Sequence, residues 1–236
     1  MKQLIKKLIR KLGYNVTRYD PDKLGYHQLE DIQHFCKTSS PLIFDVGANV
    51  GQSIDYFRTI FSDSTIHSFE PNPDIFPQLQ QHSQSLQKSF AWNFALGSKE
   101  EQLAFEVNSA SVMSSFLPLS EFGGGEVTHK VMVNVRTLDQ FCQEQDIEYI
   151  DVIKSDTQGF DLEVFKGSQK MIDEGKIGMI YFEITFSDMY KGLPSLTEIY
   201  EFLTQNNFHL IAFYDFHYQK RIASWTDALF VHKSYL

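Results

Sequence analysis

The stretch Ile43–Gln52, IFDVGANVGQ, sets the architecture of this chain. Its apolar run ends at Asp45, and Gly47, Asn49 and Gly51 follow at alternate positions. An apolar run that ends in an acid is typical of a strand buried on both faces of a sheet. The glycines let the backbone approach a ligand where a Cβ would clash. Their spacing is neither the G-x-G-x-x-G of a dinucleotide site nor the G-x-x-x-x-G-K-[ST] of a P-loop.

Strand and helix patterns alternate along most of the chain. We expect strands at 41–46, 65–71, 88–96, 150–156, 178–184, 208–216 and 228–233, with helices at 24–37, 51–61, 137–145, 161–174 and 195–206. This alternation predicts an α/β fold, a Rossmann-like, doubly wound, mostly parallel sheet of seven strands. The last two strands are too close for a helical crossover, so we expect a reversed terminal strand.

The chain divides into two parts in this interpretation. Residues 1–38 form an N-terminal helical segment, and 39–236 form the α/β domain. An insert at about 101–136 holds two strand patterns around an irregular middle. That middle contains FGGGE at 122–126, which we expect to act as a mobile lid.

Composition narrows the class of protein. Of the 236 residues 42% are hydrophobic, and the net charge of −9 argues against general nucleic-acid binding. There is no run of roughly 20 apolar residues that would span a bilayer, and the start lacks the apolar core of a signal peptide. We interpret the two cysteines, Cys36 and Cys142, as reduced thiols in a cytoplasmic protein.

The first 12 residues are an exception to the acidic composition. They hold five Lys or Arg and no acid, and their apolar residues share one helical face. Two interpretations stay open. The helix docks on the domain, or it makes peripheral contact with an anionic membrane surface on the inner face.

Two acids lie at the carboxyl ends of the first two predicted strands. In doubly wound sheets the ligand lies outside the carboxyl ends of the strands, so Asp45 and Glu70 should face one cleft. A carboxylate only accepts hydrogen bonds, so Glu70 suits the two hydroxyls of a ribose. Asp45 and the missing third glycine both count against a pyrophosphate. The negative charge of Asp45 also favours a cationic group. S-adenosylmethionine fits, because it has a ribose, an ammonium, a sulfonium and no phosphate.

Five motifs carry a family resemblance. DVGANVGQS, FEPNP, NFALG, RTLD and IKSDTQGFDLEVFKG resemble, in this order, the FkbM-type methyltransferases, a branch of the class I S-adenosylmethionine-dependent enzymes. The resemblance covers roughly residues 40–185, and DALFV near the end extends it. It implies O-methylation, often of sugars in glycans, glycolipids or natural products.

The resemblance also implies site residues. The methionine part of the cofactor would contact Asp45, Gly47, Ala48, Asn49 and Gly51; Glu70 would hold the ribose; Asn93 and Ala95 would lie by the adenine; and Asp156 would lie beside the sulfonium. A serine pair, Ser114 and Ser115, occupies the place of an acceptor-binding pair in this family.

Methyl transfer to a hydroxyl needs a base, or a metal that lowers the hydroxyl pKa. The family pattern is usually Asp-x-Glu-Gly, but here Gln158 stands where the Glu would be, and an amide takes no proton. Asp156 or Glu183 would then serve as the base, with His217 as second choice. Lys154 would orient the acceptor or pair with Asp156.

Acceptor contacts are expected from the insert and the late loops. We assign Gln158 and Tyr190 to the acceptor together with the serine pair, and we interpret Trp225 and Asp227 as ordinary packing or surface. A buried carboxylate pair can bind a divalent metal, but the histidines lack ligand spacing, so we assign no metal ligand.

Three function hypotheses remain open on the sequence. The first is an O-methyltransferase acting on a carbohydrate, glycoconjugate or natural product. The second is a nicotinamide-dependent oxidoreductase on a similar sheet, which needs a pyrophosphate cradle that DVGANVG supplies poorly. The third is a non-catalytic module that binds S-adenosylmethionine, for which Gln158 is the best support.

Overall fold

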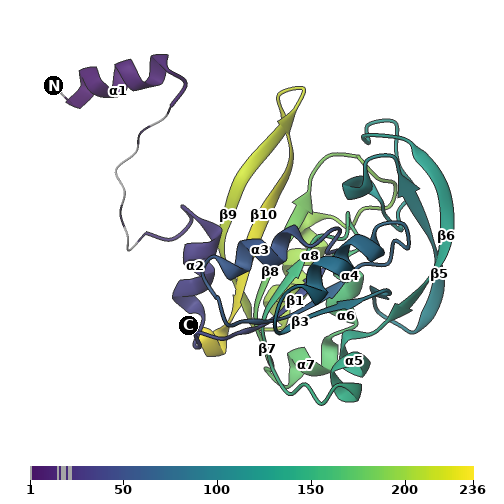
Figure 1. Cartoon of the computed structure of the whole chain (residues 1–236). Coiled ribbons are helices and arrows are strands. Elements are labelled where there is room, and N and C mark those ends of the chain that lie inside the picture. Colours follow the sequence, from purple (N-terminus) through teal and green to yellow (C-terminus); the bar gives the residue numbers. More distant parts are fainter. Residues whose placement is uncertain (1, 15, 17–19, 21–22) are drawn as a thin grey trace.

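The structure is a computed structural model that describes residues 2–14, 16, 20 and 23–236 (Figure 1). Its centre is a seven-stranded sheet. In spatial order the strands are β3 (Ser89–Trp92), β2 (Thr65–Phe69), β1 (Leu42–Val46), β7 (Ile150–Ser155), β8 (Ile177–Thr185), β10 (Ile222–His232) and β9 (Phe208–Gln219). β10 is antiparallel to both of its neighbours, and the other pairings are parallel. The predicted mixed α/β fold with a reversed last strand is confirmed.

β10 lies between β8 and β9 rather than at the sheet edge. It pairs with β9 through a hairpin and returns alongside β8, which leaves β9 at the edge. Figure 1 shows the β9–β10 hairpin extending beyond the rest of the sheet. The last strand therefore brings its first residues to the carboxyl end of β8.

Helices cover both faces of the sheet because the central strands are apolar on both sides. One face carries α2 (Gln28–Phe35), α3 (Gln52–Arg58) and α4 (Phe76–Gln84). The other carries α5 (Leu138–Glu144), α6 (Asp161–Lys166), α7 (Gln169–Asp173) and α8 (Leu196–Gln205). The predicted α8 begins at a capping box in which the side chains of Ser195 and Glu198 bond each other's backbone N–H.

The helix expected at 161–174 is two helices. Gly167 packs so close to Gly97 that a Cβ there would lie 1.9 Å from the Gly97 carbonyl oxygen. α7 then starts afresh, with the Asp139 carboxylate accepting from the backbone N–H groups of Lys170 and Met171. A long-range contact therefore breaks a locally continuous helical pattern.

The strand expected at 88–96 is also divided. β3 ends at Trp92, and Asn93 turns the chain by donating from Nδ2 to the Glu70 carbonyl oxygen. The continuation, β4 (Ala95–Leu96), pairs with β6 (Val127–Arg136), which is antiparallel to β5 (Glu101–Asn108). The insert thus forms a second sheet with β4, and it includes a short 3-10 helix, η1 (Ser111–Met113).

Near the N-terminus, α1 (Lys2–Lys11) stands apart from the α/β layers in Figure 1. Leu4, Leu8 and Leu12 are 79%, 65% and 70% exposed, so they do not pack on the domain. None of the helices in the described ranges is long and apolar enough to cross a membrane.

Candidate active site

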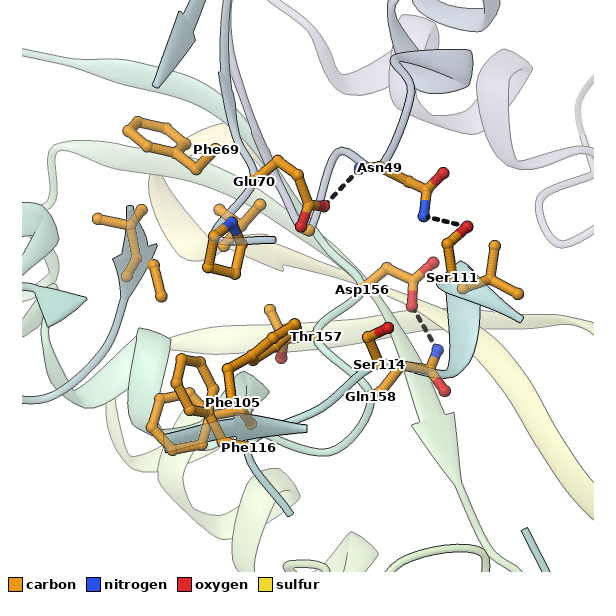
Figure 2. Close-up of a pocket in the computed structure, with 17 residues that line it drawn as sticks. Asn49, Phe69, Glu70, Phe105, Ser111, Ser114, Phe116, Asp156, Thr157 and Gln158 are labelled. Atoms are coloured by element: carbon orange, nitrogen blue, oxygen red, sulfur yellow. Dashed lines mark hydrogen bonds between the residues drawn. The ribbon is translucent and has the colours of Figure 1, made fainter. Parts of the chain in front are cut away.

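A cavity lies where the carboxyl ends of β1, β2 and β7 meet the insert, and we call it the first cavity (Figure 2). Its polar lining comes from the loops after those strands (Gly47, Asn49, Glu70, Asp156, Gln158) and from Ser111 and Ser114 of the insert. Its apolar lining includes Phe69, Pro71, Leu96, Phe105, Phe116 and Phe160. The cavity is therefore polar along the strand tips and aromatic beside the second sheet.

Glu70 is held rigidly in this cavity. It is 6% exposed, and its two oxygens accept from the backbone N–H groups of Asn49 and Asn72, both at 2.8 Å. Burial raises the pKa of Glu70 to about 7. The two hydrogen bonds lower this pKa, but their effect is smaller than that of burial. Each carboxylate oxygen has a second lone pair, so Glu70 can still accept two hydroxyl donors.

The turn after β1 joins three strand ends. The N–H groups of Gly47 and Ala48 both donate to the Phe69 carbonyl oxygen of β2 at 3.0 Å. Gly47 has φ +77°, and a Cβ there would lie 2.0 Å from the Asp156 carbonyl oxygen. Gly51, with φ +95°, precedes α3. Glycine is required at Gly47 because both the backbone conformation and the approach of the β7 loop forbid a side chain.

Asp45 does not line the first cavity, contrary to the expectation that it shares a cleft with Glu70. It is fully buried, and its Oδ1 lies 3.2 Å from Lys154 Nζ. Alternation along β1 points Asp45 toward the α3 face. Burial raises the pKa of Asp45, and the charge of Lys154 opposes this shift. Lys154 also lies 3.8 Å from Asp156 Oδ2, so it links the buried acid to the loop after β7.

A second cavity opens on the α3 face of the sheet. It is lined by Ser53 and Tyr56 of α3, by Lys154, Glu183 and Asp227 of the sheet, and by Asp156 of the loop after β7. Asp156 lines both cavities. A group bound in the first cavity and a group bound in the second would therefore meet at Asp156.

Gln158 connects the acids between the two cavities. Its Nε2 donates to Asp156 Oδ1 at 2.8 Å and to Glu183 Oε1 at 3.2 Å, and its Oε1 accepts from the Tyr190 hydroxyl at 2.9 Å. Burial, with repulsion from Asp156 next, raises the pKa of Glu183 to about 8. The amide thus holds Glu183 in a fixed position without taking up a proton itself.

The insert is tied to the strand loops by hydrogen bonds. Asn49 Nδ2 donates to Ser111 Oγ at 3.1 Å (Figure 2), and the Tyr190 hydroxyl also lies 3.0 Å from the Met113 carbonyl oxygen. These contacts hold η1 against the first cavity, which Ser111 lines. The segment FGGGE at 122–126, expected to be the lid, contributes no lining residue to that cavity.

Some of the other predicted site residues line the first cavity, and others only support residues that do. Ser114 and Ala95 line the first cavity. Ser115 lines neither the first nor the second cavity; its hydroxyl donates to the Gln158 carbonyl oxygen at 2.9 Å. Asn93 likewise supports the Glu70 backbone. His217 lines neither cavity and stacks on Trp225 at 4.9 Å between ring centroids.

Sequence reasoning missed several lining residues. Ser111 and Thr157 line the first cavity, and Tyr56 lines the second. Asp227, interpreted as packing, lines the second cavity and accepts from the Tyr181 hydroxyl at 2.6 Å. Asp227 faces Glu183 across β8 and β10. The available signal was the i, i+2 spacing of Tyr181 and Glu183, which places both on one face of a strand.

The first cavity fits a phosphate-free, positively charged nucleoside. Among the described residues that line it, none is Lys, Arg or His, whereas Glu70 and Asp156 are acids. Thr157 Oγ1 has no hydrogen-bond partner within the described chain and lines the cavity. Aromatic side chains on the insert side suit a base. In residues 2–14, 16, 20 and 23–236, no group of three His, Cys, Asp or Glu could hold a metal ion.

Two curated relatives of this chain are methyltransferases. The 2-O-methyltransferase NoeI of Sinorhizobium fredii is 25% identical over 183 residues, which are 73% of this chain and 74% of NoeI. The hexuronic acid methyltransferase AglP of Haloferax volcanii is 26% identical over 129 residues, 53% of this chain and 49% of AglP.

Solved structures share the fold. The FkbM methyltransferase of Methylobacillus flagellatus aligns with a TM-score of 0.53 at 16% identity, over 82% of this chain and 44% of its own. TrmK of M. capricolum, solved with S-adenosylhomocysteine, aligns with a TM-score of 0.51 at 10% identity, over 89% of this chain and 70% of its own. This chain thus spans less than half of the FkbM structure, and at these identities the likeness shows the fold alone.

The sequence profile of the FkbM methyltransferase domain matches residues 45–210. That range contains the turn after β1, Glu70, the insert and the Asp156–Gln158 loop. None of these similarities supports the nicotinamide-dependent alternative. The chain belongs to the FkbM methyltransferase family, whose members are S-adenosylmethionine-dependent methyltransferases.

Proposed function

We propose that this protein transfers a methyl group from S-adenosylmethionine to a hydroxyl of a carbohydrate, glycoconjugate or natural product. The name of NoeI supports transfer to an oxygen, and the name of AglP supports a sugar acceptor. The observation that carries the proposal is that Asp156 lines both cavities. Donor and acceptor held on either side of Asp156 would be aligned for an in-line displacement.

In this proposal the first cavity holds the cofactor. Glu70 accepts the two ribose hydroxyls, and the base lies near Ala95 among aromatic side chains. The backbone of Gly47 and Asn49 faces the methionine part, and Asp156 lies on the sulfonium side. When bound, S-adenosylmethionine supplies a methyl group already activated by its sulfonium. Asp45 acts indirectly, because it holds the Lys154 ammonium, which in turn positions Asp156.

Glu183 is the proposed general base. Its position in the second cavity and its raised pKa suit proton transfer near neutral pH. In this role Glu183 would take the proton from the acceptor hydroxyl that receives the methyl group. Gln158 is a positioning residue, since its amide links Glu183 to Asp156. Its presence in place of a glutamate therefore does not argue for a non-catalytic module.

We also assign the protein to the cytoplasm, at the inner face of a membrane. The exposed apolar side chains of α1 and the cationic first 12 residues support contact with anionic lipid. This assignment concerns where the reaction takes place and is independent of the catalytic groups.

The test of the function combines binding and turnover. The full chain should bind S-adenosylmethionine in calorimetry, and Glu70→Ala should lose most of that binding while the exposed-site control Glu121→Gln keeps it. Mass spectrometry of a glycoside panel should detect the gain of one methyl group. Binding of NAD(P) instead of S-adenosylmethionine would contradict the proposal, and so would cofactor binding without methylation of any acceptor.

A further inference from the structure

Asp227 occupies a position in the second cavity that the catalytic roles above leave unused. It lies in β10 directly opposite Glu183 of β8 and lines the cavity with it. The Tyr181 hydroxyl donates to Asp227 Oδ2 at 2.6 Å, which fixes the carboxylate. Within the part of the chain that the structure describes, Oδ1 receives no hydrogen bond. A fixed carboxylate with one unused oxygen at a cavity wall is suited to accept from a ligand hydroxyl.

The charges around this cavity disfavour an anionic ligand. Of the described residues that line it, Asp156, Glu183 and Asp227 are acids, and Lys154 is the one cation. Lys154 is already paired with two acids, because its Nζ lies 3.2 Å from Asp45 Oδ1 and 3.8 Å from Asp156 Oδ2. A carboxylate brought into the cavity would meet the charges of Asp156 and Asp227 in a partly desolvated site.

An aromatic surface adjoins Asp227 on the same strand. Trp225 lies two residues earlier in a register that is regular against β8, so the two side chains share a face of the sheet. The His217 ring stacks on Trp225 with an interplanar angle of 9°. Trp225 is half-buried. Trp225 is not part of the cavity lining, but an indole two residues from a hydrogen-bond acceptor suits a pyranose ring that extends past Asp227, because such a ring has an apolar C–H face and a rim of hydroxyls.

We infer that Asp227, held by Tyr181, is a specificity-determining residue that selects an uncharged sugar and rejects a uronic acid. Its free oxygen accepts a hydrogen bond from a sugar hydroxyl, and its charge repels a carboxylate. This inference rests on the proposed methyltransferase function and narrows its substrate class. It also separates this chain from AglP, whose name specifies a hexuronic acid.

The test compares matched acceptors. The full chain and S-adenosylmethionine are incubated with the methyl glycosides of glucose, galactose and mannose, and with those of the three corresponding uronic acids. Initial rates of methyl gain are measured by mass spectrometry. We expect the wild-type protein to favour hexosides over uronosides by about tenfold or more, which corresponds to about 1.4 kcal/mol.

Two variants separate charge from hydrogen bonding. Asp227→Asn should reduce the preference for hexosides by about tenfold, because it removes the repulsion. Tyr181→Phe keeps the charge, so the preference should remain while KM for the hexoside rises with little change in kcat. Asp146→Asn, at an exposed turn remote from the cavity, should change neither. Melting temperatures of all variants establish that they are folded.

Uronosides methylated as fast as hexosides, or an unchanged preference in a folded Asp227→Asn protein, would overturn the inference. So would cofactor binding with methylation of other acceptors but of neither sugar set. A wild-type protein that does not bind S-adenosylmethionine is a different result, because it contradicts the proposed function itself.

Discussion

At the scale of single residues, the unusual feature is an amide between two acids. Gln158 donates to both Asp156 and Glu183, and the Tyr190 hydroxyl donates to its carbonyl end. A glutamate there would place a carboxylate against both acids in place of a hydrogen-bond donor. The amide instead donates a hydrogen bond to Glu183, which lowers the pKa of that acid against the larger raising effect of burial.

The pH dependence of turnover follows from Glu183. Burial raises its pKa to about 8, and only the deprotonated form accepts a proton, so kcat should rise with pH through a midpoint near 8. Glu183→Gln should lower kcat by about 10²-fold or more and remove this midpoint, whereas the exposed-site control Glu148→Gln should retain both. Initial rates across the pH range check this. A Glu183→Gln enzyme with an unchanged pH profile would exclude Glu183 as the base.

Gln158→Glu tests whether residue 158 positions Glu183 through its hydrogen bonds to Asp156 and Glu183. A carboxylate in place of the amide repels Asp156 and Glu183, so the midpoint of the pH–rate profile should move to higher pH. A midpoint that stays in place would show that residue 158 does not position Glu183.

At the scale of elements, the site depends on how closely the turn after β1 approaches the loop after β7. Gly47 combines φ +77° with a carbonyl oxygen that would lie 2.0 Å from any Cβ at this position, whereas Gly192 has φ +82° and open space around it. The two glycines therefore separate backbone strain from steric contact.

Alanine at these two positions should give different results. Gly192→Ala should cost about 1 kcal/mol of unfolding free energy, from the left-handed backbone alone. Gly47→Ala should cost about 3 kcal/mol, because the Cβ also displaces the Asp156 carbonyl group, and it should weaken cofactor binding. Urea unfolding and calorimetry measure both effects. Equal losses in the two variants would mean that the close approach is unimportant.

At the scale of the whole molecule, an acidic catalytic domain carries a cationic N-terminal helix with exposed leucines. The expected membrane contact should appear as co-sedimentation with anionic vesicles but not with phosphatidylcholine vesicles. It should weaken as salt is added, because screening reduces the attraction to anionic lipid.

Two variants test this contact. Deletion of residues 1–12 should abolish sedimentation while leaving turnover on a soluble acceptor unchanged. Leu4→Ser combined with Leu8→Ser keeps the charge and should lower binding by removing buried apolar area. Sedimentation that survives the deletion would place the contact elsewhere or exclude it.

The amino-acid sequence by itself determined the order of strands and helices, the turn at Gly47 and the acid at Glu70. These features are local, since period, turn residues and strand-end acids are written in consecutive residues. Only the tertiary structure decided which way each carboxylate points. It turned Asp45 toward the α3 face of the sheet, where the side chain pairs with Lys154. It also divided the expected strand at 88–96 and the expected helix at 161–174 through contacts with distant backbone.

The second cavity was decided in the same way. Asp227 and Glu183 are 44 positions apart, and they become neighbours only because β10 runs antiparallel to β8 and lies between β8 and β9. Strand pairing between distant segments depends on packing of the complete sheet rather than on local pattern. A residue such as Asp227, which reaches the site through this pairing, therefore has no local signature in the chain.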